Sequence, residues 1–418
     1  MKRLLRHVVI DIGPLRRRRE FRLLWIGQAV SFFGSMVTQV AIPYQTYQLT
    51  HSSLAVGLLS AVQLVPLVSM LLFGGLLADT VDRRRLVLMA ETALLSTSLA
   101  LLVNARLAHP QLWLLFVVGA LMSAFSGIQG PPLDALLPRV VERDELPAAV
   151  ALSMLRGTVG SIAGPALGGV LIGAAGLGAA YAFDAATFAV SLAALGLMRA
   201  VPPPDTASPP GLGAMAEGFR FAWSRPEILG TYGVDIVAMF FGMPMALFPA
   251  LAQQFGGGTA LGLLYAAPSM GSLLASATSG WVSRVDRHGA AVCLAAAGWG
   301  AGIVCLAFAP TLALAVVSLA FAGFCDMLSG LFRGVIWNRA IPDRLRGRLA
   351  AINQISYSTG PLLGNVESGF ASALIGLRGA IWSGGLLCIV GVAGAMLLLP
   401  EFWRYNSARR PEGVSESA

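Results

Sequence analysis

The sequence predicts an all-α membrane protein with twelve transmembrane helices in two six-helix pseudo-repeats, and three observations support this fold class. Of the 418 residues, 56% are hydrophobic and only 12% are charged, whereas soluble domains carry roughly 25% charged residues. The apolar residues gather in segments long enough to cross a bilayer, which takes about 20 residues in a helix. A glycine pattern from the first half of the chain also returns in the second half.

Twelve apolar segments are expected to cross the membrane, six on each side of a proline-rich connector. The first begins near Phe21, and its length favours a retained span over a cleaved signal peptide. The expected spans are residues 22–48, 54–78, 85–105, 111–131, 148–173, 178–199, 228–252, 260–282, 290–309, 311–332, 350–374 and 379–400.

The repeated glycine pattern links the two halves of the chain. Gly160, Gly164 and Gly169 recur 200 residues later, at positions 360, 364 and 369. Small residues spaced about one helical turn apart allow two membrane helices to approach closely. A duplicated half built from such helices is typical of secondary transporters.

Arginine residues concentrate in the loops that an even number of spans places on one side of the membrane. The N-terminal arm carries Arg16–Arg19 and the loop after the second span carries Arg83–Arg85, whereas the loops of the other side carry only Arg106 and Arg378. The positive-inside rule then predicts that both termini are cytoplasmic. We therefore explain the net charge of +8 by topology, and we expect contact with lipid and no nucleic-acid partner.

The sequence predicts no cofactor, metal site or catalytic centre. Its only lysine is Lys2, so the phosphate-binding loop of ATPases is missing. The four cysteines and four histidines form neither a CxxC pair nor a ligand cluster. A membrane-embedded enzyme would need such a cluster or a nucleophile–base set, and we expect an ion or substrate gradient to supply the energy instead.

The expected domain organisation follows from the connector. Residues 1–200 are predicted to form an N-terminal six-helix bundle, 201–226 a cytoplasmic linker, 227–400 a C-terminal six-helix bundle and 401–418 a cytoplasmic tail. Prolines at 202–204 and 209–210 interrupt regular structure in the linker. Ala214–Trp223 is predicted to form a short amphipathic helix on the cytoplasmic membrane face.

The loop after the second span carries a known motif. It reads Gly75-Leu-Leu-Ala78-Asp79-Thr-Val-Asp82-Arg83-Arg84-Arg85, and it resembles the G-x-L-A-D-R-x-G-R-R motif of the major facilitator superfamily. The match departs from the motif at Thr80 and Asp82. The resemblance implies the major facilitator fold for residues 15–400.

A second motif resembles that of exporters within this superfamily. Gly160, Gly164, Pro165, Gly168 and Gly169 match the pattern of the fifth helix in such exporters. The whole chain is similar to enterobactin-type siderophore exporters and to macrolide and multidrug efflux proteins. Further residues that carry this similarity are Leu49–Ser52, Val56, Gly57, Phe248–Ala252, Asp326, Ser329, Arg333, Pro342, Asp343 and Arg346–Arg348. The fourth span lacks the arginine of many proton-coupled drug exporters.

Gly75, Asp79, Arg83 and Arg84 form a candidate cytoplasmic gate. A carboxylate at a helix end can cap a neighbouring helix or pair with arginine. The gate would close when the substrate cavity faces outward. The alternative is a solvated loop that only sets topology.

Three acidic residues lie deep in the expected spans, where a charge costs roughly 2.5–3.5 kcal/mol on insertion scales. Asp235 and Glu367 have no obvious partner in the sequence, and such a carboxylate can take up and release a proton as access alternates. Asp326 shares a helix face with Ser329 and Arg333. Asp235, Glu367 and Asp326 are therefore candidates for proton coupling and Arg333 for an ion pair, although a compensated polar stripe is the alternative for Asp326. Glu91 and Asp184 are expected nearer to helix ends, where capping suffices.

The superfamily resemblance implies a substrate cavity lined by spans one, four, seven and ten. Polar and aromatic residues of span one, and the aromatic and methionine residues beside Pro244 in span seven, suit a large and partly apolar ligand. Pro244 and Pro249 predict a bend in span seven. The cavity candidates are Gln28, Gln39, Tyr44, Phe240, Phe241 and Met243.

Together these features predict a monomeric, multi-pass exporter of the cell inner (plasma) membrane. We expect it to exchange protons for a small amphipathic organic molecule, with an enterobactin-type siderophore as the leading substrate. A multidrug or macrolide efflux pump and a lysophospholipid flippase are the alternatives.

Overall fold

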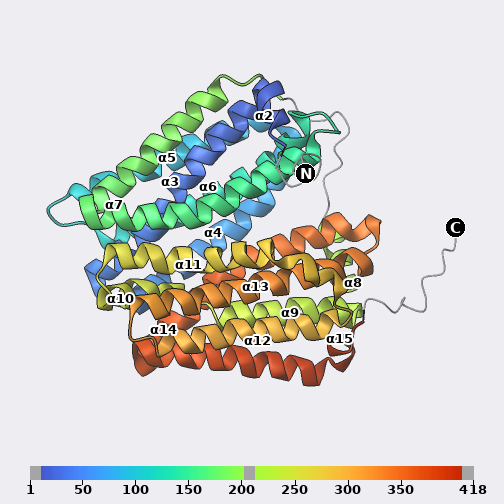
Figure 1. The fold of residues 1–418 in the computed structure, drawn as a ribbon. Helices are drawn as coiled ribbons and strands as arrows, with labels where there is room; N and C mark the ends of the chain where they lie inside the picture. Colours follow the sequence, from blue (N-terminus) through green and yellow to red (C-terminus); the bar gives the residue numbers. More distant parts are fainter. Residues whose placement is uncertain (1–10, 202–211, 407–418) are drawn as a thin grey trace, which may run out of the picture. The chain divides into compact units, whose positions relative to one another are not determined.

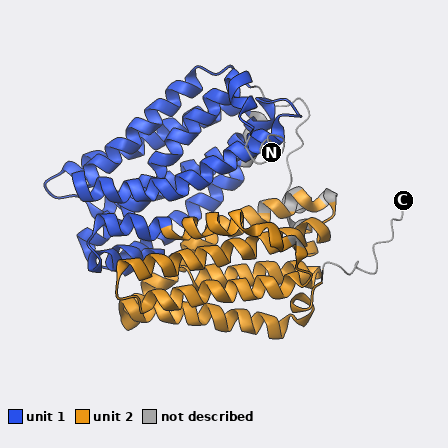
Figure 2. Ribbon diagram, in the orientation of Figure 1, with its two compact units in different colours: residues 1–209, 245–266 blue, residues 210–244, 267–418 orange. Residues whose placement is uncertain are grey.

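The computed structural model describes residues 11–201 and 212–406, and within these residues all regular structure is helical (Figure 1). The chain divides into two compact units (Figure 2). Unit 1 contains residues 1–209 and 245–266, and unit 2 contains residues 210–244 and 267–418. The domains expected from the sequence, residues 1–200, 201–226, 227–400 and 401–418, remain a prediction.

Unit 1 is built around five long helices. Their order and bounds are α2 (Gly13–Arg17), α3 (Arg19–Thr50), α4 (Ser53–Thr80), α5 (Arg83–Arg106), α6 (Leu112–Leu136), the 3₁₀ turn η1 (Leu137–Arg139) and α7 (Leu146–Gly196). The later segment of this unit holds η2 (Met245–Leu247), α10 (Phe248–Gln254) and the first part of α11 (Gly258–Ala277).

Unit 2 begins with the short helix α8 (Leu212–Ser224), which confirms the helix expected over Ala214–Trp223. The remaining elements are α9 (Pro226–Phe241), the rest of α11, η3 (Ser279–Arg284), α12 (His288–Ala307), α13 (Leu312–Ala340), α14 (Asp343–Leu398) and α15 (Pro400–Trp403). In α8, Ala222 is buried against α9 and α14, while Phe219 and Trp223 are exposed and their rings lie 5.8 Å apart.

Ten segments of the described chain are long and apolar enough to cross a membrane, and they coincide with the spans expected from the sequence. Two of them are about twice as long as one crossing requires. The segment in α7 has 51 residues and the segment in α14 has 47. Each of these expected pairs of spans is therefore joined without an intervening loop.

A single glycine breaks each of the two long helices. Gly176 has φ 80° and ψ 176°, and Gly376 has φ 77° and ψ 170°. This region of backbone conformation is essentially restricted to glycine. Both breaks fall in the short gaps that the sequence placed between expected spans, and they lie at equivalent positions of the two repeats.

The bend predicted in the seventh span is also present. Helix α9 ends at Phe241, and the chain passes through η2 before α10 begins. The indole Nε1 of Trp299 donates a hydrogen bond to the Gly242 carbonyl oxygen at 2.8 Å. This bond satisfies a backbone acceptor in a region where a membrane offers no water.

One end of unit 1 is fastened by apolar and ionic contacts between helix termini. Phe21 and Leu24 of α3 pack with Leu136 of α6 and Leu195 of α7. Nearby, Arg18 forms ion pairs with Glu142 and Glu145, and their hydrogen bonds raise the pKa of the Arg18 guanidinium.

We predict that Gly176→Ala lowers the stability of the protein by about 1–3 kcal/mol, because an L side chain would be strained at this backbone conformation. Thermal unfolding in detergent measures the change. Gly157→Ala in the same helix is the matched control, since a Cβ there meets no atom within 4 Å and alanine favours a helix. Equal melting temperatures for the two variants would contradict the proposed strain.

Candidate functional site

The loop motif connects α4 to α5 through a helix cap. Asp82 precedes α5, and its Oδ1 accepts a hydrogen bond from the Arg85 backbone N–H at 2.9 Å. The motif's departure from glycine at this position thus supplies an N-cap. Gly75 and Asp79 belong to α4, but their surroundings, including the Asp79 carboxylate, lie outside what the structure describes.

Two arginines of the motif bind the ends of neighbouring helices. Arg83 is only 8% exposed and donates to the Ala135 carbonyl oxygen of α6. Arg84 donates to the carbonyl oxygens of Leu195 and Gly196, both at 2.7 Å. Positive charge on the last carbonyls of a helix satisfies free acceptors and complements the helix dipole. The Arg84 side chain therefore holds α5 to the end of α7.

The glycines of the fifth-helix motif lie where α7 contacts α3. A Cβ added at Gly160 or Gly164 would collide with Phe32 or Met36 respectively, and one added at Gly168 would lie 3.2 Å from the Val37 Cα. Pro165 is buried inside the same helix. The motif thus allows the two helices to pack with little space between their backbones.

Gly169 makes a different close contact, within unit 1, to the first turns of α11. A Cβ there would lie 2.6 Å from the Gly258 carbonyl oxygen and 2.7 Å from the Gly262 Cα. Here glycine faces glycine on both helices.

The second copy of the pattern repeats the first contact in unit 2. A Cβ added at Gly360 would lie 2.9 Å from Met239 Sδ of α9, and one added at Gly364 would collide with the Met239 carbonyl oxygen of the same helix. The sequence repeat is therefore also a structural repeat, with α14 packed on α9 as α7 is packed on α3.

The main cluster of charge in unit 2 brings α9 and α13 together. Arg333 of α13 forms an ion pair with Asp235 of α9, and their side chains are 12% and 5% exposed. The expectation that Asp235 has no charged partner is wrong. That partner comes from a helix about one hundred residues away in sequence, and spacing within one helix could not reveal it.

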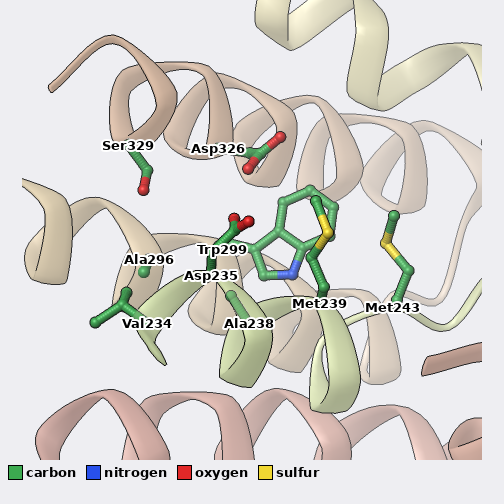
Figure 3. A pocket seen from close by; sticks show the side chains of 9 residues that line it. All are labelled: Val234, Asp235, Ala238, Met239, Met243, Ala296, Trp299, Asp326 and Ser329. Carbon is green, nitrogen blue, oxygen red and sulfur yellow. The ribbon is translucent and has the colours of Figure 1, made fainter. Parts of the chain in front are cut away.

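Asp326 lies near this pair and lines a small cavity together with Asp235. Figure 3 shows Asp235 and Asp326 on opposite walls of this cavity. In the described residues the Asp326 carboxylate makes no hydrogen bond and no ion pair. The cavity holds about 20 Å³, which is room for about one water molecule. Its other lining residues are Val234, Ala238, Met239, Met243, Ala296, Trp299 and Ser329.

Glu367 of α14 is half-buried. Within the part of the chain that the structure describes, its carboxylate has no hydrogen bond or ion pair. The next residue, Ser368, donates a weak hydrogen bond of 3.4 Å to the Met243 carbonyl oxygen.

Two buried acids of unit 1 were underestimated from the sequence. Glu91 and Asp184 are both fully buried, so the expectation that they need only end-capping is wrong. Glu91 Oε1 accepts hydrogen bonds from Gln28 at 2.5 Å and Gln129 at 3.1 Å. Asp184 Oδ2 accepts from Thr38 and Ser98, both at 2.7 Å. A polar residue in each facing span is the signal that could have identified them.

The candidate cavity residues have different surroundings. Gln28 and Tyr44 are buried, and the Gln28 amide donates a hydrogen bond to Glu91. Gln39 is exposed, and Phe240, Phe241 and Met243 are half-buried. The two phenylalanine rings meet edge to face with centroids 4.9 Å apart. No group of three or more metal-binding side chains occurs among the described residues.

Comparison with protein families identifies the class of this chain. The family described as transmembrane secretion effector matches residues 11–412. The chain is 29% identical over 412 residues to the enterobactin exporter EntS of Citrobacter koseri, covering 98% of both proteins. It is 28% identical over 411 residues to enterobactin exporter EntS of Escherichia coli O1:K1 / APEC, covering 98% of this chain and 99% of that protein.

Solved structures share the fold at low sequence identity. A POT family transporter in complex with 5-aminolevulinic acid superposes with a TM-score of 0.73 at 11% identity, covering 92% of this chain and 97% of the other. A bacterial homologue of the iron transporter ferroportin in its inward-facing state gives 0.68 at 15% identity, covering 92% and 98%. All these proteins are transporters, and the chain is a multi-pass membrane protein with a transporter fold.

We predict that Arg333→Leu destabilises the protein by about 3–5 kcal/mol, because it leaves Asp235 buried without its partner. The double variant Asp235→Asn with Arg333→Leu removes the unpaired charge and is expected to recover much of the loss. Melting temperatures in detergent for the two single variants and the double variant measure this coupling. Strictly additive losses would contradict it.

Proposed function

The chain belongs to the transmembrane secretion effector family of the major facilitator superfamily, and from this premise we propose that it is a secondary active exporter of a siderophore. Its substrate class is the enterobactin type, a small amphipathic organic molecule, and its location is the inner (plasma) membrane. The observation that carries the proposal is the similarity to enterobactin exporters over 98% of the chain.

We propose twelve membrane crossings with both termini in the cytoplasm. The ten apolar segments become twelve if each long segment crosses twice and turns at Gly176 or Gly376. The arginine-rich loops then lie on the cytoplasmic side. In this scheme residues 1–200 and 227–400 are the two six-helix bundles, and the protein acts as a monomer.

Export is proposed to be driven by proton antiport through the acids of unit 2. Arg333 pairs with Asp235, and Asp326, which lines the same cavity as Asp235, has no hydrogen-bond or ion-pair partner among the described residues. The Arg333 guanidinium can neutralise only one carboxylate, that of Asp235. Binding of a proton to Asp326 would neutralise the second carboxylate. The cavity has room for about one water, which suits a proton and excludes an organic substrate. Glu367 is the second candidate carrier.

The proton gradient supplies enough energy for such a step. Moving one charge through the membrane potential is worth about 2.3 kcal/mol per 100 mV. Each 1.4 kcal/mol corresponds to a tenfold concentration ratio. One proton per substrate would therefore support a gradient of more than tenfold at about 100 mV.

Substrate contacts are proposed for candidate residues of each unit taken separately. Gln39 is exposed on α3, while Phe240, Phe241 and Met243 lie at the end of α9, where the helix breaks. Tyr44 is buried, and Gln28 is held by Glu91, so their roles would be indirect. Aromatic and methionine side chains adapt to large ligands, which also keeps multidrug or macrolide efflux as an alternative.

We predict proton-dependent siderophore uptake into inside-out vesicles that contain this protein. Under an imposed pH gradient, uptake of a catecholate siderophore is compared with uptake of a lipophilic cationic dye and of a lysophospholipid. Siderophore uptake that collapses with the gradient supports the proposal. Dye uptake alone would indicate multidrug efflux, and lysophospholipid movement alone would indicate a flippase.

The coupling residues are tested in the same vesicles. Asp326→Asn and Glu367→Gln are expected to reduce gradient-driven uptake at least tenfold, because neither amide can carry the proton. Asp144→Asn is the matched control, since Asp144 is exposed and lies outside the membrane-spanning segments. Uptake at the control level in both variants would exclude these residues as carriers.

We also propose that the loop motif of Gly75, Asp79, Arg83 and Arg84 acts as a gate latch. Arg83 and Arg84 already join α5 to the ends of α6 and α7. Asp79→Asn is predicted to slow siderophore uptake several-fold without changing the amount of folded protein, because the loss of one charge weakens the latch. Transport at the wild-type rate would show that the loop only sets topology.

A further inference from the structure

A large cavity of unit 1 lies at the ends of α3, α5 and α7. Its volume is about 570 Å³, which is within the usual range of ligand pockets. Its walls come from Gln45, Gln48 and Leu49 of α3, Ala105 and Arg106 of α5, Pro110, and Ala175–Ala179 around the break in α7.

Arg106 is the charged residue of this cavity. Among the described residues its guanidinium makes no hydrogen bond and no ion pair, and no acidic side chain lines the cavity. The arginines of the loop motif, in contrast, bind helix ends. Arg106 is also one of the two arginines that the charge pattern assigns to the side opposite the arginine-rich loops.

Two amide side chains add hydrogen-bond donors to the same wall. Gln45 Oε1 accepts a hydrogen bond from the Tyr181 hydroxyl at 2.7 Å, so the nitrogen of this amide remains as its free donor. Gln48 is exposed and has no hydrogen bond within the described residues. A guanidinium and amide N–H groups form a donor set suited to the oxygen atoms of an anion.

The internal repeat shows that the cavity is a specific feature of unit 1. Gly178 lines the cavity, and its equivalent 200 residues later is Arg378. Arg378 donates to the Ala307 and Ala309 carbonyl oxygens at 2.6 and 2.9 Å, so in unit 2 a side chain caps the end of α12. In unit 1 this position has no side chain, and the arginine nearby has no partner.

We propose that this cavity, defined by Arg106, Gln45, Gln48 and Gly178, is a binding site for an oxyanion such as a phosphate group. The group could be the headgroup of an anionic phospholipid or a free inorganic anion, because both present the same oxygen atoms to Arg106. The proposal concerns binding within unit 1 alone and does not depend on the transported substrate.

Thermal unfolding of the purified full chain in detergent tests the site. Inorganic phosphate, a short-chain phosphatidylglycerol and the zwitterionic short-chain phosphatidylcholine are titrated separately, and the rise in Tm gives an apparent Kd. A rise with phosphatidylglycerol but not with phosphate identifies a lipid headgroup, and a rise with phosphate identifies a free anion. No rise with either anion, or an equal rise with phosphatidylcholine, would overturn the proposal.

Variants assign any binding to this cavity. Arg106→Gln is expected to keep the Tm of the free protein, because among the described residues the side chain has no hydrogen bond or ion pair to lose. It is expected to weaken the apparent Kd at least about tenfold, as expected for a charged hydrogen bond. Gly178→Leu should also abolish binding by filling the cavity, since a Cβ there meets nothing closer than 3.8 Å.

Arg378→Gln is the matched control for the loss of an arginine. It should lower the Tm of the free protein, because two hydrogen bonds are lost, and leave the response to the anion intact. An Arg106→Gln protein that responds like the wild type would place the anion elsewhere and overturn the proposal.

Discussion

Close approach of helix backbones is the constraint on which the other features of this structure depend. Lipid tails are as apolar as leucine, so helices in a bilayer gain little from hydrophobic burial and associate mainly through packing and hydrogen bonds. Gly160 and Gly164 remove the side chains that would separate α7 from α3, and Gly360 and Gly364 do the same for α14 and α9. The polar side chains of each unit can then reach partners on neighbouring helices.

The buried acids illustrate what this packing makes possible. A buried charge needs a countercharge or several hydrogen bonds. Asp235 has the guanidinium of Arg333, whereas Glu91 accepts from two amides and Asp184 from two hydroxyl groups. Asp326 and Glu367 have no such partners among the described residues. The buried acids of this protein therefore differ in how their charge is compensated.

The sequence predicted the helices better than the contacts between them. Apolar length and proline position depend on local chemistry, so the apolar spans, the gaps in which Gly176 and Gly376 lie, and the bend in span seven could be anticipated. The partner of Asp235 could not, because Arg333 lies on a different helix. The burial of Glu91 was also missed, since its distance from a helix end says nothing about which neighbours surround it.

The two units share a backbone pattern but differ in their chemistry. The breaks at Gly176 and Gly376 have nearly the same dihedral angles, yet two residues later one repeat has glycine and the other has an arginine that caps α12. In the same way, the described buried acids of unit 1 are held by neutral donors, whereas Asp235 of unit 2 is held by a charge. The glycine contacts keep the packing of the helix backbones similar in the two units, whereas other positions, such as 178 and 378, carry different side chains. Duplication can therefore yield two bundles with similar backbones whose buried acids have different kinds of partner.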